Sequence, residues 1–444
     1  MGRRPRSKTL QLWMNGTPVG QWRLDAHGDD LLTYDPSWLG SPQFRPISLS
    51  LPAPAGGGPL RSPSVAAYFD NLLPDSAFMR QRLQDRFHTA STSPFDLLAA
   101  IGRDCVGALQ LIPEGETPAN VETVEVEPMD DDGVERELRR AAAPRAAAGS
   151  GAEDEDDQPL RISLAGAQEK TALTWHEGRW CRPRNATPTT HIFKLPLGLV
   201  GNRQADMSTS VENEWLCSEF LRAFDVPVAH CEIRRFGAQK ALVVERFDRR
   251  LHSSRRFWVR LPQEDFCQAT GTPSARKYQA DGGPGIFELA RILERSEARD
   301  ADLRTLLSAQ LLFWMLAAPD GHAKNFSVHL LPGGRYRLTP LYDVLSAWPM
   351  VGDGASHYAY QKLKLALALR AKNVHYRMGE IHRRHFVETA RGCGLGSEFD
   401  AVIDDIVARA PSVVAYVGAR LPAGFPARVF ETITQGLLIS AARL

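Results

Sequence analysis

Three side chains that could support phosphoryl transfer stand close together in the sequence. Asp320 and Asn325 lie five positions apart in the segment DGHAKN, and Asp343 comes after the next two apolar runs. These runs, Phe326 to Leu331 and Tyr336 to Leu338, flank a Pro-Gly-Gly turn, a pattern that predicts a β hairpin. An Asp can align an attacking hydroxyl group and accept its proton, while an Asn and a second Asp hold the magnesium ion that neutralises phosphate charge.

The spacing D-x-x-x-x-N is that of the protein-kinase catalytic loop, in which a magnesium-binding Asp also follows on a later strand. It assigns proton acceptance to Asp320 and metal coordination to Asn325 and Asp343. The same residue types are ordinary loop formers, and a lone match of this kind is common by chance. The hypothesis therefore depends on whether the chain also holds a nucleotide-binding half.

Upstream of the hairpin, the chain supplies a candidate for each part of such a half. In chain order these are the small-residue loop around Gly166, a strand lysine at Lys194, a helix glutamate at Glu214 with Glu219 as the alternative, and an adenine-binding segment at 245–247. Each candidate alone is weak, because the loop lacks a G-x-G-x-x-G or Walker pattern and a strand lysine is usually solvated. Their order along the chain is what favours a nucleotide site.

Composition bounds the class of protein. The 444 residues are enough for two to three domains, and the hydrophobic share of 43% with a net charge of +1 is typical of a soluble protein without broad affinity for nucleic acid. Six cysteines without C-x-x-C spacing predict neither a disulfide framework nor a zinc site. No stretch is apolar enough for a membrane span, and we expect a cytoplasmic protein without a membrane partner.

The pattern of the chain predicts an α+β fold with two lobes. We expect an N-terminal α+β subdomain over 1–115, a flexible linker over 116–158, a nucleotide-binding part over 159–250 and a helical C-terminal lobe over 251–444. The linker expectation includes a candidate helix from Asp130 to Ala143, followed by a tract that lacks apolar residues. In the last part, one strong helix, Asp302 to Ala317, leads directly to Asp320.

Long motifs in this chain resemble the HipA family of serine/threonine kinases, the toxins of type II toxin–antitoxin modules. The motifs are ISLAGAQEKTAL, HIFKLP, VERFDRR, LPQEDFCQA, KYQADGGPG, DGHAKNFSVH and LYDVLSA, and YFDNLLPDS resembles the hallmark of the family's N-terminal domain. The likeness covers nearly the whole chain except the linker, which is longer than the resemblance leads us to expect. Pro319, before Asp320, is a second departure, since a Thr or Ser is expected there.

The resemblance implies a kinase-like fold with an N-terminal α/β part, an all-α C-terminal part, and ATP with Mg²⁺ between them. It implies catalytic roles for Asp320 and Lys324, and Mg²⁺ coordination by Asn325 and Asp343. The implied ATP-binding residues are Ser163, Leu164, Ala165, Gly166, Ala167, Gln168, Lys194, Glu245, Phe247 and His322. Ser163 also matches the serine that the family autophosphorylates to inactivate itself, since a phosphate of about −2 charge would repel ATP from this loop.

The implied partners are a HipB-like helix-turn-helix antitoxin, operator DNA bound mainly through that antitoxin, and a protein substrate, which in the best-known relatives is glutamyl-tRNA synthetase. Phosphorylation of that substrate stalls translation and makes cells dormant. Two alternatives stay open: an antitoxin-bound corepressor with a degenerate kinase site, and a kinase for small molecules. Arg377, Arg383 and Arg384 could meet DNA phosphates or form a solvated helix face.

Overall fold

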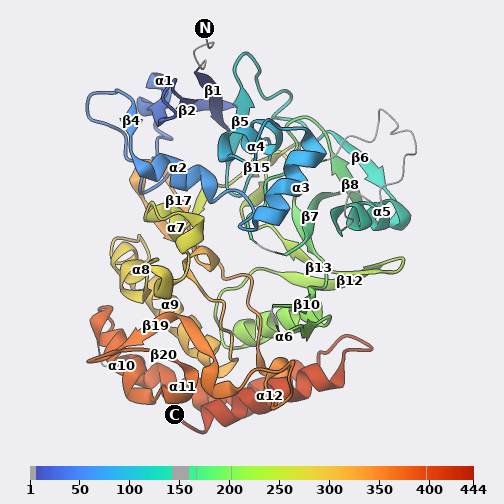
Figure 1. Ribbon diagram of the computed structural model, residues 1–444, viewed down its shortest axis with the longest axis vertical. Helices are drawn as coiled ribbons and strands as arrows, with labels where there is room; N and C mark the ends of the chain where they lie inside the picture. Colours follow the sequence, from blue (N-terminus) through green and yellow to red (C-terminus); the bar gives the residue numbers. More distant parts are fainter. Residues whose placement is uncertain (1–6, 143–159, 167, 202, 397) are drawn as a thin grey trace.

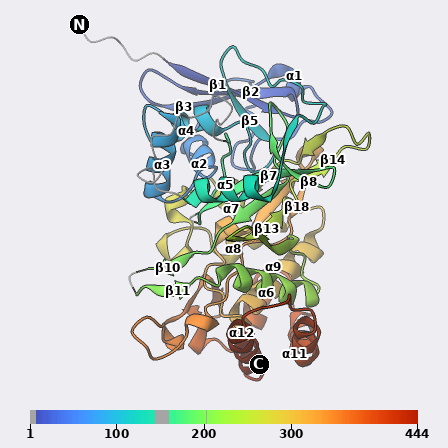
Figure 2. The ribbon, with the colours of Figure 1, turned by 90° about the vertical axis from the view of Figure 1, so that its right-hand side faces the viewer.

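The computed structural model describes residues 7–142, 160–166, 168–201, 203–396 and 398–444. Figures 1 and 2 show an N-terminal part at the top, a second sheet at its side, and a mainly helical part below that ends in α10 (Arg383–Gly392), α11 (Glu398–Gly418) and α12 (Ala427–Ala441). Among the described residues, no helix is long and apolar enough to cross a membrane. The arrangement is the α+β, two-lobed fold that the sequence predicts.

The N-terminal part is an antiparallel sheet covered by helices. Its strand order is β4-β3-β2-β1-β5, and the bounds are β1 (Lys8–Met14), β2 (Thr17–Leu24), β3 (Asp30–Tyr34), β4 (Leu60–Arg61) and β5 (Leu109–Pro113), with α1 (Pro36–Leu39), α2 (Pro63–Asp70), α3 (Ala77–Phe87) and α4 (Pro94–Ile101). An Asn15-Gly16 turn joins β1 to β2, and both residues have positive φ, as a tight hairpin turn requires. Ser62, Ser76 and Ser93 cap the three longer helices as residues of this type commonly do.

The second sheet, which we call the small-lobe sheet, is antiparallel throughout with the order β12-β13-β9-β7-β8-β6. Its strands are β6 (Val126–Met129), β7 (Lys170–His176), β8 (Arg179–Pro183), β9 (His191–Lys194), β12 (Cys231–Phe236) and β13 (Gln239–Glu245). Helix α5 (Asp131–Ala142) packs on it through Val134 and Leu138, which share a core with Leu173 and Phe193.

This packing corrects part of the linker expectation. The candidate helix from Asp130 is present as α5, but it is an ordered part of the small lobe together with β6, because its apolar stripe is buried against the sheet. Residues 126–142 are therefore not a free linker. The rest of the expected linker, 143–159, lies outside the described residues.

The C-terminal lobe is built around the buried helix α9 (Arg299–Met315). Its other helices are α6 (Ser210–Ala223), α7 (Phe266–Ala269), α8 (Ile286–Leu293) and α10 to α12, and the short strands beside them are β10 (Gly198–Val200), β11 (Ala205–Met207), β14 (Arg249–Leu251), β15 (Trp258–Arg260), β16 (Gln263–Asp265), β17 (Ser327–Leu330), β18 (Tyr336–Leu338), β19 (Lys364–Arg370) and β20 (Val374–Arg377). The expectation of an all-α part needs correction, since β19 and β20 form an added hairpin there. Helix α11 continues through Pro411 without a break.

Candidate active site

The chain that leads to Asp320 is held by the most buried helix of the lobe. Residues Ala309 to Leu316 are almost inaccessible to solvent, and the helix ends as Ala317 adopts a positive φ of 47°. The position after Asp320 requires glycine, because a Cβ atom on Gly321 would lie 2.4 Å from the ring of Phe313. The loop thus rests on the core of the lobe, which fixes the backbone on either side of Asp320.

Hydrogen bonds within the loop fix Asn325 against Asp320. The Asn325 Nδ2 group donates to the Asp320 carbonyl oxygen at 2.7 Å, and the Asn325 backbone N–H donates to the His322 carbonyl oxygen at 2.9 Å. With its amide nitrogen engaged in this way, the Asn325 Oδ1 atom is the one left for a metal. The predicted hairpin β17–β18 follows directly, so this part of the sequence prediction is confirmed.

Two aromatic groups surround the Asp320 carboxylate. The Tyr278 hydroxyl donates to Asp320 Oδ1, and His322 Nε2 lies 3.8 Å from the same oxygen. The Asp320 side chain is nevertheless 53% exposed, which leaves room for an incoming hydroxyl group. Burial lowers the pKa of His322, so the ring is a neutral donor or acceptor at physiological pH, and its Nδ1 atom has no hydrogen-bond partner among the described residues. Tyr278 was not predicted from the sequence, although it lies in the motif KYQADGGPG.

Across the site, Lys194 on β9 joins the two lobes. Its Nζ atom bonds to Glu214 on α6 and to Asp343 Oδ1, at 2.5 and 2.9 Å. The pairing of Lys194 with Glu214 that the sequence predicts is confirmed, and the alternative, Glu219, instead pairs with Arg222. Lys194 and Glu214 are buried, whereas the Asp343 side chain keeps 32% of its surface exposed. Asp343 therefore has one oxygen engaged and an open face.

The charges of this cluster set one another's protonation. Desolvation opposes ionisation of Asp343, but the Lys194 and Lys170 ammonium groups lower its pKa to about 2. Desolvation likewise opposes the charge on Lys194, yet Asp343 and Glu214 together raise the pKa of that lysine. Asp343 is thus a carboxylate over the whole physiological pH range, as a metal ligand must be.

Lys170, a second lysine of the cluster, was missed in the sequence. It opens β7 directly opposite Lys194 in the strand register, and its Nζ atom donates to the Ala165 carbonyl oxygen. Desolvation lowers the pKa of Lys170 to about 8, against the pull of the Asp343 carboxylate. The available signal was its place at the end of the motif AGAQEK, where the small-residue loop leads into the strand that pairs with β9.

The small-residue loop lies between the N-terminal part and the Lys194 cluster. Gly166 has a φ of 106°, forms a bridge with Pro74, and would place a Cβ atom 2.7 Å from Lys170 Nζ, so this position requires glycine. Leu164 is buried, and Gln168 donates from Nε2 to the Leu195 carbonyl oxygen at 2.6 Å. Ala167, also predicted for this loop, lies outside the described residues.

Ser163 is fully buried before this loop. Its Oγ atom donates to the Leu72 carbonyl oxygen at 2.7 Å, and its backbone N–H donates to the Asp104 carbonyl oxygen at 3.1 Å. Both partners belong to the N-terminal part. In this conformation the Ser163 hydroxyl faces protein rather than solvent.

The predicted adenine segment lies at the end of β13. Glu245 is exposed there and its backbone N–H donates to the His230 carbonyl oxygen. Phe247 is half-buried, with its ring centroid 5.7 Å from that of His329 and 5.8 Å from that of Tyr342. Tyr342 directly precedes Asp343, and its hydroxyl donates to the Lys324 carbonyl oxygen. Tyr342 therefore contacts both the loop 320–325 and Phe247.

Lys324 lies apart from these groups. Its Nζ atom donates to the backbone and side-chain oxygens of Asn71, both at 2.9 Å, and lies 3.4 Å from Asp265 and 3.7 Å from Asp75. Burial opposes its charge, but Asp265 and Asp75 raise its pKa. These partners belong to the N-terminal motif YFDNLLPDS and to the end of β16. The contacts make Lys324 an anchor that ties the loop 320–325 to the N-terminal part.

Comparisons with known proteins give the family context. Residues 162–414 match the family model of the HipA-like C-terminal domain, and residues 10–112 match that of the HipA N-terminal domain. Y4mE of Sinorhizobium fredii (strain NBRC 101917 / NGR234), named as a candidate kinase, is 35% identical over 345 residues, which cover 76% of this chain and 77% of the relative. The serine/threonine-protein kinase toxin HipA of Shewanella oneidensis is 27% identical over 353 residues, which cover 76% of this chain and 75% of the relative.

A solved structure extends the likeness to the whole fold. Shewanella oneidensis MR-1 HipA, in its complex with HipB and operator DNA, superposes with a TM-score of 0.78 at 22% identity. The superposition covers 98% of this chain and 97% of that chain. The N-terminal part, the small lobe and the helical lobe are therefore arranged in this chain as they are in that protein.

Proposed function

Because this chain belongs to the HipA family of kinases, we propose that it is an ATP- and Mg²⁺-dependent serine/threonine protein kinase that acts as the toxin of a toxin–antitoxin module. The single observation that carries the proposal is the contact of Lys194 with both Glu214 and Asp343. A lysine held between a helix glutamate and the carboxylate that follows the catalytic loop is the arrangement that positions ATP phosphates in protein kinases. A chain with a degenerate site would have no need to keep three such charges together at a cost in desolvation.

In this proposal each residue has a defined task. Asp320 accepts the proton of the acceptor hydroxyl at its exposed carboxylate, while Tyr278 fixes the orientation of that group. Asn325 Oδ1 and the open face of Asp343 are oxygen donors of the kind that Mg²⁺ prefers, so they fit this ion, whose charge would neutralise the phosphates. Lys194 and Lys170 bind phosphate oxygens beside the loop that contains Gly166.

The remaining predicted contacts concern the nucleotide. We assign the backbone of Leu164 to Gln168 to the phosphates, Glu245 and Phe247 to adenine, and the unpartnered Nδ1 atom of His322 to a polar group of the nucleotide. Lys324 is a positioning residue in this scheme rather than a catalytic one, since its ammonium group is used on Asn71 and Asp265.

Autophosphorylation of Ser163 is the proposed self-inactivation. Its hydroxyl is buried on Leu72, so the segment must leave the N-terminal part before the serine can reach a catalytic site. A phosphate of about −2 charge could not return to that buried position without a large desolvation cost. Phosphorylation would therefore hold the loop away from the place where it binds ATP.

The proposed partners follow from the family. They are a HipB-like antitoxin, operator DNA reached mainly through that antitoxin, and a protein substrate, for which an aminoacyl-tRNA synthetase such as glutamyl-tRNA synthetase is the first to test. Two of the three basic residues considered for DNA have local acidic partners, since Arg377 pairs with Glu380 and Arg383 pairs with Asp400 and Asp404. This pairing supports indirect rather than direct contact with DNA.

The test is incorporation of labelled phosphate by the purified full-length chain. Asp320→Gln should reduce incorporation by at least about 10²-fold, because the acceptor hydroxyl loses its proton acceptor. Asp404→Gln, at an exposed carboxylate on α11, is the matched control and should keep full activity. If the Asp320→Gln protein still incorporates phosphate at the original rate, the assignment of the catalytic residue fails.

A second arm of this test identifies the acceptor. Mass spectrometry of the wild-type chain should find the phosphate on Ser163, and Ser163→Ala should abolish self-labelling while leaving transfer to a protein substrate. Labelling of small alcohols or aminoglycosides in place of protein would overturn the protein-kinase assignment and favour a small-molecule kinase.

A further inference from the structure

A second pocket lies between the N-terminal part and the small lobe, outside the site described above. Its volume is about 450 Å³, within the range of small-molecule sites. One wall comes from residues beside β5, a second from residues 160–162, and a third from the end of β8 with residues 184–187. None of the residues proposed for ATP or Mg²⁺ lines this pocket, which we call the arginine pocket.

The lining of the arginine pocket is strongly positive. Among the residues that the structure describes, five arginines line it, namely Arg103, Arg161, Arg182, Arg184 and Arg260, and Asp104 is the single lining carboxylate. The Asp104 carboxylate is already bound by Arg249 and Arg260, so it does not neutralise the other four arginines.

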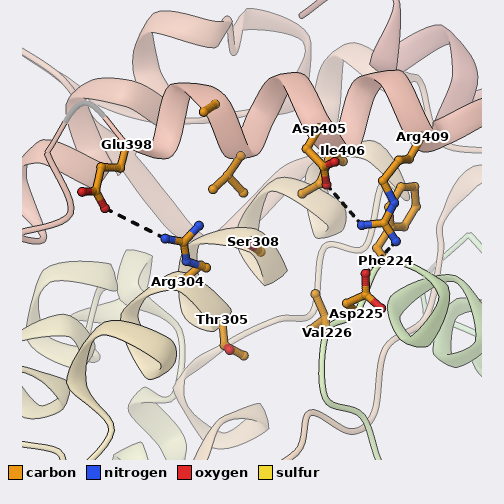
Figure 3. Close-up of a pocket in the computed structure, with 12 residues that line it drawn as sticks. Phe224, Asp225, Val226, Arg304, Thr305, Ser308, Glu398, Asp405, Ile406 and Arg409 are labelled. Carbon is orange, nitrogen blue, oxygen red and sulfur yellow. Dashed lines mark hydrogen bonds and ion pairs between the residues drawn. The ribbon is translucent and has the colours of Figure 1, made fainter.

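A pocket in the helical lobe provides the contrast. It has a volume of about 360 Å³ and lies between α9, α11 and the end of α6 (Figure 3). Its two arginines each face carboxylates: Arg304 lies 3.9 Å from Glu398, and Arg409 binds Asp225 and Asp405 at 2.7 and 3.1 Å. Both arginines there already face carboxylates, and the lining has no excess of positive charge, so nothing in it calls for an anionic ligand.

Two buried polar atoms of the arginine pocket lack a partner among the described residues. Gln110 is only 1% exposed, and while its Nε2 atom donates to the Arg103 carbonyl oxygen at 3.1 Å, its Oε1 atom accepts no hydrogen bond. The Nε–H group of Arg103 is also buried and unpaired. Leaving a buried donor and a buried acceptor unsatisfied is costly, and a ligand with an acceptor and a hydroxyl donor would satisfy both.

Three of the arginines are available to such a ligand. Arg161 makes no ion pair with any described residue, whereas Arg103 and Arg184 are paired at 2.6 Å with Glu116 and Glu127, both more than half exposed. Exposed pairs of this kind contribute little, so a dianion could take over these guanidinium groups. Arg182 and Arg260 are instead held by buried carboxylates and form a fixed wall.

We propose that the arginine pocket binds a phosphate ester that also carries a hydroxyl or amino group. The phosphate lies between the guanidinium groups of Arg103, Arg161 and Arg184, and the second group donates to Gln110 Oε1. Residues 160–162 continue into Ser163, whose backbone N–H already bonds to Asp104, so an occupied pocket would also hold the segment that precedes the phosphate loop. The proposal is independent of kinase activity.

Isothermal titration calorimetry of the nucleotide-free full-length chain tests this proposal. Glycerol 3-phosphate is the probe, glycerol the matched ligand without phosphate, and phosphoserine distinguishes an amino-acid ester from a polyol ester. We expect the phosphate ester to bind and glycerol not to bind. Arg161→Glu should raise the Kd by roughly tenfold or more, as expected for a lost charge-assisted contact, and Arg184→Glu should do the same.

Two further variants make the result decisive. Arg256→Glu, which makes the same charge change at an exposed residue outside the pocket, should leave the Kd unchanged, and so should Lys194→Ala, which disables the nucleotide site. Binding that survives Arg161→Glu but is lost in Lys194→Ala would place the phosphate in the nucleotide site and overturn the proposal. Absence of binding at millimolar concentrations of both esters would also overturn it.

Discussion

Two buried charge clusters join the parts of this molecule, and their carboxylates differ in how fully they are satisfied. Asp104 accepts hydrogen bonds from the backbone and hydroxyl of Thr189 and from Arg249 and Arg260, at 2.7 to 3.1 Å. Asp343 accepts from Lys194 alone among the described residues. Both carboxylates face cations, but the Asp104 side chain is 9% exposed while the Asp343 side chain is 32% exposed.

The difference separates a structural cluster from a site poised for a ligand. The Asp104 carboxylate has no acceptor capacity left, and its cations raise the stability of the ionised form enough to lower its pKa far below the usual range despite burial. Asp343 has spare acceptor capacity and sits at a φ of 63°, a strained conformation for a residue other than glycine. Open acceptors and backbone strain together are typical of functional sites.

Asp343→Asn is the sharpest way to break this comparison. The amide keeps the size of the side chain and tolerates the positive φ, but it loses the charge that we propose holds Mg²⁺. Phosphoryl transfer should fall by about 10³-fold, while the melting temperature changes by only a few degrees. Phosphate incorporation and thermal unfolding measured on one preparation check both halves. If the melting temperature also falls strongly, the loss of activity reflects a loss of stability, and Asp343 is as structural as Asp104.

Asp104→Asn should give the opposite pattern. Removing this charge leaves Arg246, Arg249 and Arg260 without their shared partner in a buried place, which should cost about 3 kcal/mol or more in the free energy of unfolding. Urea denaturation measures this cost, with the exposed Asp404→Asn as the control that should leave the transition near that of the wild type. If Asp104→Asn unfolds at the wild-type urea concentration, this cluster does not stabilise the junction.

The sequence predicted one of these clusters and not the other, for a physical reason. The parts of the Lys194 cluster follow in an order that phosphoryl transfer imposes, so Lys194, Glu214 and Asp343 could be assigned from type and spacing. No such order links Asp104 to its arginines. Asp104 belongs to the N-terminal part and meets these arginines only through tertiary packing. Lys170 was missed for the same reason, since only the register of β7 against β9 brings it beside Lys194.

Secondary structure was predictable where periodicity and turn residues agree, as in β1 to β3, α6, α9 and the β17–β18 hairpin. The β19–β20 hairpin was missed because Leu365 to Leu369 reads as a continuous apolar run within a helical region. Its strict alternation of leucine and alanine was the signal for a strand, and both faces of β19 are buried. Helix α5 was predicted as a helix, but it was assigned to the linker because its polar composition concealed a narrow apolar stripe that packs on a sheet.

Glu264 on β16 extends the comparison to a carboxyl group that is paired with no cation among the described residues and is shielded from solvent. It is fully buried at the contact with the N-terminal part, where one oxygen accepts from the Leu49 backbone N–H at 2.8 Å and the other has no partner among the described residues. Burial raises its pKa from 4.5 to about 8. The folded chain therefore holds a proton on Glu264 that the unfolded chain releases above pH 4.5.

The sign of the resulting pH dependence follows from this difference. Between pH 4.5 and about 8 the native state binds more protons than the unfolded state, so stability falls as the pH rises, by up to about 1.4 kcal/mol per pH unit. Glu264→Gln keeps the shape and removes the ionisation, so urea unfolding at a series of pH values should show a flatter profile and a gain in stability near pH 8. If the pH profiles of the wild type and Glu264→Gln are parallel, Glu264 is already ionised in the native state. A buried carboxylate at this position would then be stable without arginines of the kind that surround Asp104.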